Sequence, residues 1–408
     1  GTYSPTGHPS AIIGTVSGTT ISFGTEVIFN ASHSEWPSVA FDPYTSGKFI
    51  VAYTDGGNQD KGTAIVGTIS GTSISFGAEY LFYGLKSNHN VIAFDPHTSG
   101  RFVVGYSDKS NVYKGAAILG TVSGTAMSFG SAVFFNNANY TGDINVAFDP
   151  NTANKLVISY RNGSNSNYGT AIVGTASGTS LSFGTGVVYN SAPSYYNQLA
   201  FDSNPSNTGK FVVAYKNSST GTAIVGTVSG TGLSFGTATA FNVGATSNEI
   251  SMSFDPNTLG YFVVAYSDTG TNFATSIVGT ISGSTLTFGS EYAISTTGGT
   301  YSPQAVTVSF DPNNAGKFIL AFRDNGSSPA GDGTYAIGQL PIPGTNLTTT
   351  NFIGISSAAY TNGQTAAITL KGGTSENQSG LTIGSTYYVQ DDGTVGLVAD
   401  TPSVEAGI

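Results

Sequence analysis

The side chains best suited to ligand chemistry are aromatic and amide residues in segments that vary along the chain. The only tryptophan is Trp36. Aromatic rings surrounded by amides and few charges suit stacking on sugar rings and hydrogen bonding to hydroxyls. The predicted ligand-binding residues are Trp36, His33, His89, Tyr140, Tyr195, Tyr196, Asn197 and Tyr301. The alternative is that these are ordinary loop residues, with the rings packed at a rim.

Carboxylates could instead support glycoside hydrolysis, which requires two carboxyl groups facing each other. The acids and cations that interrupt the repeat described below are Glu35, Asp60, Asp143, Glu249, Asp332, Arg161 and Arg323. No pair of acids has a diagnostic spacing, although Glu35 with Asp143 is conceivable. The sequence contains no nucleophile elbow, no phosphate loop and no His-x-Glu zinc signature with its pair of cysteines. We therefore predict a protein that is not an enzyme, with a glycoside hydrolase as the alternative.

Metal and cofactor sites are not expected. The four histidines, His8, His33, His89 and His97, form no ligand pair at helical or hairpin spacing. The chain has no cysteine, which excludes a disulfide framework and a thiolate site. Loops of the Asp-x-Asp type that bind calcium are also lacking. We predict no metal and no cofactor.

These residues are positioned by a repeat of about 53 residues. One phrase, "AFDPYTSGKFIVAY" at Ala40, returns as "AFDPHTSGRFVVGY" at Ala93 and in four further copies. A second phrase, "AIVGTISGTSISFG" at Ala64, alternates with it. The aspartates of the first phrase are Asp42, Asp95, Asp149, Asp202, Asp255 and Asp311, with spacings of 53, 54, 53, 53 and 56. Such a period is typical of a solenoid, propeller or array.

Each repeat predicts four short antiparallel strands, because runs of apolar and β-branched residues are bounded by Gly, Pro, Asn and Asp. We predict an all-β protein, a β-propeller of four-stranded blades over residues 1–340. If one strand pair precedes residue 1, the ring has seven blades, which we favour; six is the alternative. The chain opens in mid-phrase, so we expect a fragment or a processed product. A linker over 341–351 and a small β-rich attachment or oligomerisation module over 352–408 complete the prediction.

The repeated aspartates are predicted to be structural. In "FDPYTSGKF" the proline fixes φ and the carboxylate can accept backbone N–H groups two or three residues on. A left-handed glycine then ends the turn. This local mechanism needs no ligand, so we assign Asp42, Asp95, Asp149, Asp202, Asp255 and Asp311 to turns rather than to a metal or catalytic role.

The loops divide into a repeated set and a variable set. The turn between the first and second strands ("DPxTxGK") and the turn between the third and fourth ("SGT") barely change between copies. The other two loops change completely, as in "NASHSEWPS" (30–38) and "NSAPSYYNQ" (190–198). In an up-and-down blade these two sets lie on opposite faces. Since function concentrates on loops held by a rigid scaffold, we expect it on the variable face.

Bulk composition excludes several classes of protein. The formal net charge is −10 with 13 Lys and Arg, so the chain lacks the clustered cations that bind phosphates, and we predict no nucleic-acid partner. No apolar run is long enough to span a bilayer, so we predict no membrane insertion. With 39% hydrophobic and 12% aromatic residues, the composition is not that of a disordered chain.

The repeat phrases and the segment "GLTIGSTYYVQDDGTVGLVADTPSVEAG" near the C-terminus resemble repeat-containing, virion-associated and tail-fibre-like proteins of tailed, marine-type bacteriophages. The resemblance covers nearly the whole chain but carries over no catalytic residue. It implies a structural or adhesive virion protein, a fibre, spike or decoration exposed on the virion surface. The expected partners are other virion proteins, a host-surface glycan or receptor and further copies of the chain. A spacer without a ligand is the remaining alternative.

Overall fold

The structure is a computed structural model that describes residues 8–243, 247–294, 302–324 and 332–340, together with five short strands nearer the C-terminus. The chain divides into two compact units, 1–339 and 340–408. The strands described in the second unit are β29 (Gly354–Ser356), β30 (Ile368–Leu370), β31 (Tyr387–Val389), β32 (Val395–Gly396) and β33 (Val404–Gly407). In that unit β29 pairs with β30, and β31 pairs with β32 and β33. The segment 341–351, predicted to be a linker, lies outside the described residues.

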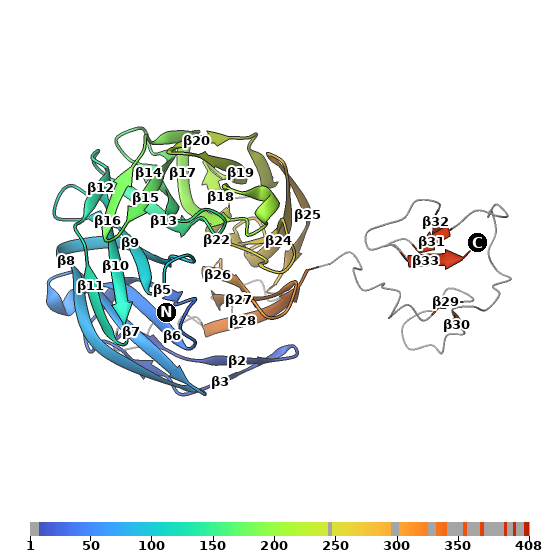
Figure 1. Cartoon of the computed structure of the whole chain (residues 1–408), viewed down its shortest axis with the longest axis horizontal. Helices are drawn as coiled ribbons and strands as arrows, with labels where there is room; N and C mark the ends of the chain where they lie inside the picture. Colours follow the sequence, from blue (N-terminus) through green and yellow to red (C-terminus); the bar gives the residue numbers. More distant parts are fainter. Residues whose placement is uncertain are drawn as a thin grey trace. The chain divides into compact units, whose positions relative to one another are not determined.

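The first unit is a ring of repeated antiparallel sheets (Figure 1). We call the sheets blades and their strands A to D in chain order. Strands A of blades 1 to 6 are β5 (Ser34–Phe41), the second half of β8 (Ser73–Phe94), β13 (Thr141–Phe148), the second half of β17 (Val187–Phe201), β22 (Ser247–Phe254) and β26 (Gln304–Phe310). Strands B are β6 (Lys48–Asp55), β9 (Arg101–Asp108), β14 (Lys155–Asn162), β18 (Lys210–Asn217), β23 (Tyr261–Asp268) and β27 (Lys317–Asp324).

The outer half of each blade is made by strands C and D. Strands C are β7 (Lys61–Ser70), β10 (Lys114–Ser123), β15 (Tyr168–Ser177), β19 (Thr220–Ser229), β24 (Phe273–Ser282) and β28 (Asp332–Gln339). Strands D of blades 1 to 5 are the first half of β8, β11 (Ala126–Phe129) with β12 (Val133–Asn136), β16 (Ser180–Phe183) with the first half of β17, β20 (Gly232–Phe235) with β21 (Thr239–Asn242), and β25 (Thr285–Ala293). Two 3-10 turns, η1 (Gly56–Asn58) and η2 (Pro205–Asn207), interrupt the loops.

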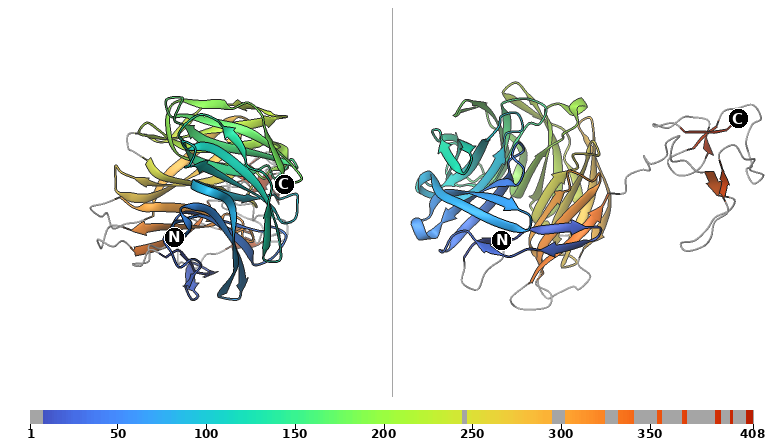
Figure 2. Two further views of the ribbon diagram at one scale, coloured as in Figure 1. Left: turned by 90° about the vertical axis from the view of Figure 1, so that its left-hand side faces the viewer. Right: turned by 60° about the horizontal axis from the view of Figure 1, so that its bottom comes forward.

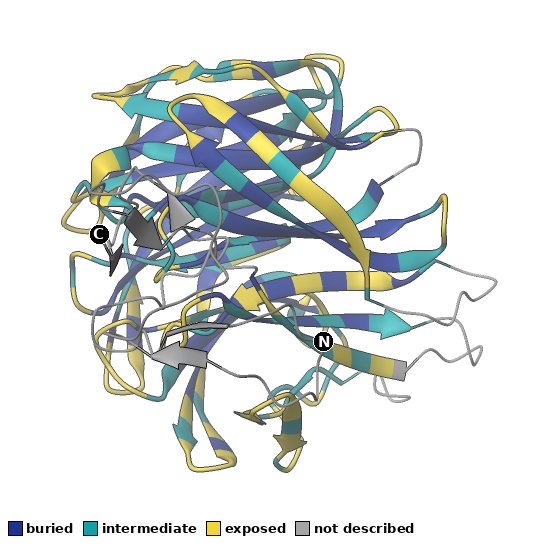
Figure 3. Ribbon diagram, turned by 90° about the vertical axis from the view of Figure 1, so that its right-hand side faces the viewer, coloured by how far each residue is buried: buried dark blue, intermediate teal, exposed yellow. Residues whose placement is uncertain are grey.

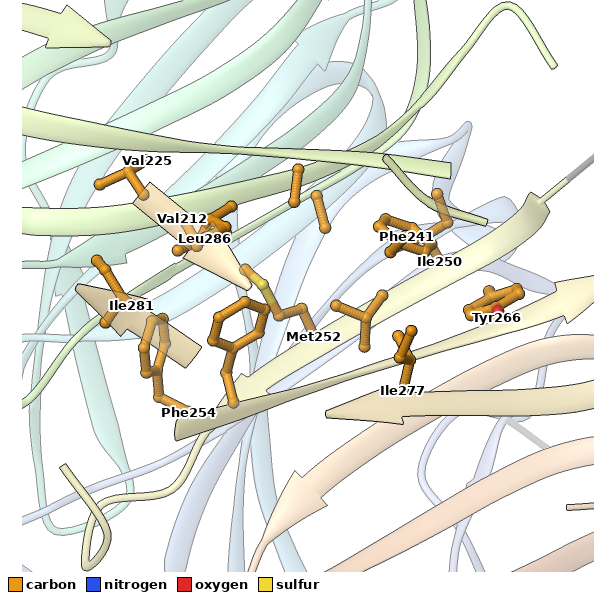
Figure 4. Close-up of a cluster of buried hydrophobic side chains, with 14 residues drawn as sticks. Val212, Val225, Phe241, Ile250, Met252, Phe254, Tyr266, Ile277, Ile281 and Leu286 are labelled. Atoms are coloured by element: carbon orange, nitrogen blue, oxygen red, sulfur yellow. The ribbon is translucent and has the colours of Figure 1, made fainter. Parts of the chain in front are cut away.

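The core lies between neighbouring blades. Strands B and C are buried on both faces, so they read as continuous apolar runs rather than alternating ones; every residue of β9 is buried. Figure 3 shows buried residues along these strands and exposed residues at the hairpin tips. In the cluster of Figure 4, Val212 and Val225 of blade 4 belong to the same apolar layer as Met252 and Phe254 of blade 5. Each such side chain contributes about 1.5–3 kcal/mol on burial, so stacked sheets stabilise one another. The predicted β-propeller is confirmed.

The N-terminal strands form the outer half of a seventh blade. Here β1 (Ser10–Ala11) and β2 (Gly14–Ser17) pair with β4 (Val27–Ile28) and β3 (Thr20–Phe23), as strands C and D do elsewhere. On one side the Phe23 ring meets the Tyr335 ring of blade 6, with centroids 5.6 Å apart. On the other side Ile13 and Phe29 pack against the core of blade 1. Figures 1 and 2 show this hairpin between β28 and β7. The ring therefore has seven positions, as favoured from the sequence, and the seventh is described only in its outer half.

Hydrogen bonds of the repeated turns stabilise one face of the propeller. In all six copies the Oδ1 atom of the aspartate accepts the backbone N–H of the residue two positions on, at 2.8–2.9 Å. In four copies the side chain of that second residue also reaches the next blade. For example, Asn151 Nδ2 donates to the Asp202 carbonyl at 3.0 Å, and Tyr44 Oη donates to the Pro96 carbonyl at 2.9 Å. The aspartates hold both a turn and a contact between blades.

The two sets of loops lie on opposite faces, as expected for up-and-down blades. The Val122 N–H of a third-to-fourth-strand turn donates to the Gly100 carbonyl of the first-to-second-strand turn of the same blade, at 2.8 Å. On the other face the Gly163 N–H of the loop between strands B and C donates to the Tyr140 carbonyl of the loop that precedes strand A, at 2.8 Å. The variable loops therefore share one face, which we call the variable face.

Candidate ligand-binding site

Strand A carries a β-bulge near its start in every one of the six blades that have this strand. In blade 1, Glu35 pairs with Thr54 and Ser38 pairs with Ala52, so two residues, Trp36 and Pro37, stand opposite Tyr53 alone. The same register shift recurs in the other five strands A. The residue opposite each bulge is a buried aromatic: Tyr53, Tyr106, Tyr160, Tyr215, Tyr266 and Phe322. A fixed ring thus supports each bulge from strand B.

The first residue of each bulge has a left-handed backbone. Its φ lies between 47° and 54° in all six copies. The six residues, which we call the axial residues, are Trp36, His89, Asp143, Tyr196, Glu249 and Ala305. Glycine relieves the strain of a positive φ, which costs other residues on the order of 1–3 kcal/mol. None of the six is glycine, and no two are the same.

Neighbouring axial residues touch one another around the ring. The Trp36 and His89 rings lie 4.0 Å apart between centroids, with an interplanar angle of 38°. Asp143 Oδ1 accepts the Tyr196 backbone N–H at 3.0 Å. The Glu249 carboxylate likewise accepts the backbone N–H of Ala305. Since strands A are the innermost strands and contact each other from blade to blade, these contacts run around the axis of the propeller.

The six axial residues together form what we call the axial ring. Cations from strand B flank the axial ring in blades 3 and 4. Arg161 Nε donates to Asp143 Oδ2 at 2.6 Å, and its guanidinium lies 5.2 Å from the centroid of the Tyr195 ring. Lys216 Nζ donates to Asn248 Oδ1 at 2.8 Å and lies 6.0 Å from the Tyr196 ring centroid. Blades 1, 2 and 5 carry Thr or Ser at the same position of strand B. The variable face therefore combines aromatic, acidic and basic groups.

Burial shifts the ionisation of several axial groups. It lowers the pKa of His89, an effect that Asp143 opposes and Arg161 reinforces, so the imidazole is neutral at pH 7 and can both donate and accept a hydrogen bond. Burial raises the pKa of Glu249; the Ala305 N–H lowers it and the Asp143 charge raises it further. Burial also raises the pKa of the Tyr196 hydroxyl, followed by the charges of Glu249 and Asp143. Asp143 is thus close enough to influence three other axial residues.

The second residue of two bulges is a buried asparagine. Asn90 donates from Nδ2 to Thr54 Oγ1 at 2.9 Å, and its Oδ1 has no partner among the described residues. Asn197 is 2% exposed, and within the described part of the chain neither its Nδ2 nor its Oδ1 has a partner. A buried amide without partners costs about 1–3 kcal/mol. Asn197 therefore has unused hydrogen-bonding capacity beside the axial ring.

The structure brings together part of the set predicted from sequence. Trp36, His89 and Tyr196 are axial residues, Asn197 directly follows one, and Tyr195 lies under Arg161. His33 and Tyr140 are not axial residues: His33 Nε2 is 3.3 Å from Glu35 Oε1 in an exposed pair, and the exposed Tyr140 ring stacks on Tyr113 with centroids 5.7 Å apart. His33 lines the same cavity as Trp36. Tyr301 lies outside the described residues.

The bulges and the role of Lys216 were not predicted. Asp143, Glu249 and Arg161 were recognised from sequence only as charges that interrupt the repeat. The available signal was positional, because each axial residue lies six positions before a repeated aspartate, as Trp36 does before Asp42. Alignment of the copies on that aspartate shows a position occupied by six different residues. The conceivable acid pair of Glu35 with Asp143 is not supported by any contact, since Glu35 pairs with His33 and Asp143 with Arg161.

The described residues hold neither a cluster of metal ligands nor a membrane-spanning helix. In this part of the chain no three His, Cys, Asp or Glu side chains are grouped as a metal ion would require. No helix there has the length and hydropathy that a membrane crossing demands.

Comparison with solved structures places the fold among known propellers. The chain is similar to a Lactobacillus plantarum protein (TM-score 0.50, 12% identity, 80% of this chain and 98% of that one). It is similar to the periplasmic gluconolactonase of Pseudomonas aeruginosa (TM-score 0.50, 11% identity, 80% and 95%). It is also similar to the NanB sialidase of Streptococcus pneumoniae (TM-score 0.50, 10% identity, 76% and 69%). Identities this low show a shared fold and nothing finer. No protein-family model and no curated protein matches the sequence.

Proposed function

We propose that this propeller binds a glycan on its variable face, at the axial ring. The observation that supports this most strongly is the set of six equivalent bulges. Each holds a side chain in a strained conformation, and the six side chains differ, whereas the turns of the opposite face repeat almost unchanged. A scaffold role would be met by glycine at every bulge. Strain kept at equivalent positions with different chemistry favours a site in which the side chains themselves matter.

The chemistry of the ring suits a sugar. Trp36 is 45% exposed and its ring contacts the tilted ring of His89, so Trp36 offers an aromatic surface for the apolar face of a pyranose. Asp143 and Glu249 supply acceptors for sugar hydroxyls, and Tyr196 supplies a hydroxyl that stays protonated. Few polar groups on an otherwise rigid apolar frame are typical of ligand sites.

We also propose that the protein is located on the surface of a virion. The resemblance of the repeats to phage fibre-like proteins supports a role on a virion surface, where glycan binding would serve attachment to a host. In that setting the propeller would recognise the glycan, and residues 352–408 would serve as the attachment or oligomerisation module. The spacer without a ligand is the outcome if no binding is found.

Binding to a glycan array, repeated on whole host cells where a host is known, tests the proposal. The full chain is compared with Trp36→Ala and with Tyr292→Ala, which removes a 74% exposed tyrosine from β25, away from the ring. We expect Trp36→Ala to lose at least about tenfold in affinity, since burying a large apolar side chain contributes on the order of 1.5–3 kcal/mol and about 1.4 kcal/mol corresponds to tenfold. We expect Tyr292→Ala to bind like the unmodified chain. Equal binding by all three proteins would contradict an axial site.

A glycan-cleaving activity is the second candidate, favoured by one observation. Asp143 and Glu249 both lie on the axial ring and differ in environment: Asp143 is paired with Arg161, whereas burial raises the pKa of Glu249. Opposed environments of this kind distinguish the base or nucleophile from the acid in glycosidases. The test is release of reducing ends from the polysaccharide that binds, with Glu249→Gln and Asp143→Asn as variants. Release that both variants abolish would favour the enzyme over the binding module.

A further inference from the structure

An apolar groove occupies the inner half of the seventh blade position. It is a cavity of about 950 Å³ between β5 of blade 1 and the N-terminal strands. Its lining includes Ile13, Phe29, Val39 and Phe41, and it extends to Trp36 on the axial ring. The groove continues the interfaces between blades that make up the core of the ring.

The exposed side of β5 is an interface surface without its partner. Val39 is 57% exposed and Phe41 59%. The equivalent residues of strands A in blades 3 to 6 are 5–8% exposed: Val146, Leu199, Met252 and Val308, with Phe148, Phe201, Phe254 and Phe310. In blade 2, Ile92 is buried against Ile50 and Ala52, which belong to strand B of the preceding blade. The inner strands of a preceding blade are therefore what covers this surface elsewhere.

A glycine of β2 points to the same absent strands. In five blades a glycine of strand C lies under a phenylalanine of strand B, so closely that an added Cβ would be 2.1–2.3 Å from the ring. The pairs are Gly67 with Phe49, Gly120 with Phe102, Gly226 with Phe211, Gly279 with Phe262 and Gly338 with Phe318. Gly14 holds this position in β2, where an added Cβ would come near only Ile21 and Phe23 of its own hairpin. Gly14 is present, but the phenylalanine side chain that lies over the equivalent glycine in the other blades has no counterpart among the described residues.

The inner edge of β2 is free to accept a strand. In blade 1, strand C runs for ten residues, Lys61–Ser70, and pairs with strand B along most of that length. β2 runs for four residues, and among the described residues it pairs only with β3. Such an edge is a template for addition of another strand.

We infer that the groove is the docking site for one further copy of the repeat's own A–B hairpin. Its strand B pairs with β2 and places an aromatic ring over Gly14, and its strand A covers Val39 and Phe41. The hairpin would carry a seventh bulge beside Trp36 and so complete the axial ring. This inference concerns how the ring closes and does not depend on the proposed glycan site.

The test uses the full chain and a synthetic peptide with the sequence of residues 87–108, the A–B hairpin of blade 2. We expect saturable one-to-one binding by calorimetry and a melting temperature that rises with peptide concentration. We also expect slower amide exchange in Gly14–Ser17. Gly14→Ala should weaken binding about tenfold, since a methyl group would meet the incoming ring. Gly84→Ala, at an exposed glycine with open space around it, is the matched control and should bind normally.

A fused variant covers the case of a peptide that does not fold by itself. Residues 87–106 joined ahead of Gly1 keep the frame of the repeat, because Gly120 follows Gly14 by 106 positions. We expect this fusion to melt at a higher temperature than the original chain and to bind no peptide. The same fusion carrying Phe102→Ala should lose most of the gain.

Three results would overturn the inference. The first is no binding of the peptide together with no stabilisation by the fusion. The second is self-association of the original chain that Phe41→Lys abolishes, since a second copy would then cover the face. The third is slow amide exchange in Gly14–Ser17 of the free chain, which would mean that another segment of this chain already occupies the edge. None of these readouts involves a glycan, so failure here leaves the proposed function untouched.

Discussion

At the scale of single residues, equivalent positions of the repeat separate structure from recognition. Six aspartates make the same hydrogen bond in six turns, and the sequence alone predicted that role from the Asp-Pro pair and the glycine that most copies share. Ser203 follows Asp202 instead, and Asn154 takes the glycine position in blade 3. Six axial residues share a backbone conformation, and no two of them are the same amino acid. The sequence could not show this, because a left-handed φ at Trp36 or Glu249 is imposed by the bulge and has no local signature in residue type.

The repeated aspartates are not equally important to stability. Asp95 is fully buried and pairs with the buried Arg101, whose Nε lies 2.7 Å from Oδ2. Asp311 makes the same turn without a buried cation. We expect Asp95→Ala to lower the free energy of unfolding by about 3–5 kcal/mol, because it leaves the buried charge of Arg101 without its carboxylate. Asp311→Ala should cost about 1 kcal/mol. Urea unfolding of the two variants checks this, and equal losses would count against a buried ion pair.

Glu249 gives a pH dependence of known sign. Its pKa is raised above 4.5 in the folded chain, first by burial, so it contributes stability that is fully present below pH 4.5 and is lost as pH rises through the folded pKa. Glutamine keeps an acceptor for the Ala305 N–H and cannot ionise. We expect Glu249→Gln to match the unmodified chain near pH 4 and to be the more stable protein near pH 7. Unfolding free energies at both pH values measure this; a difference independent of pH would contradict it.

At the scale of elements, the strands and faces were predictable and the bulges were not. Alternating apolar runs and turn residues indicated four strands a repeat, and the contrast between repeated and variable loops indicated two faces. The extra residue of the bulge adds no turn signal in a strand such as β22, since "SNEISMSF" reads as an ordinary strand; only Pro37 of β5 hints at a bulge. Its effect is nevertheless decisive for the site: axial residues contact each other between blades 1 and 2, 3 and 4, and 5 and 6.

The glycines of strand C test how tightly the elements fit. At Gly67 an added Cβ would lie 2.1 Å from Phe49 Cζ, within a buried sheet, whereas at Gly14 the closest atom is Ile21 Cγ2 at 3.0 Å. We expect Gly67→Ala to destabilise the chain by about 2 kcal/mol more than Gly14→Ala, because overpacking a filled interior costs about 1–3 kcal/mol. Thermal unfolding of both variants provides the comparison. A similar loss in both would mean that Gly14 is already covered.

At the scale of the whole molecule, the period of the repeat predicted the propeller, and the count of its phrases favoured seven positions. The structure adds which position is incomplete and which surfaces that leaves open. Neither follows from periodicity, since exposure of Val39 and Phe41 depends on the blade that precedes them in the ring rather than on their own phrase. The placement of the protein on a virion comes from sequence resemblance alone and stays a prediction.

The central claim is that ligand binding occurs at the axial ring of the variable face, and the single tryptophan offers the most direct measurement. Trp36 is an axial residue, so its emission reports on that ring without a label. Titration of the full chain with a glycan selected on the array should change the emission saturably, with the same dissociation constant as calorimetry. Tyr196→Ala should weaken both signals together. Calorimetric binding that leaves Trp36 emission unchanged would place the ligand elsewhere and contradict the claim.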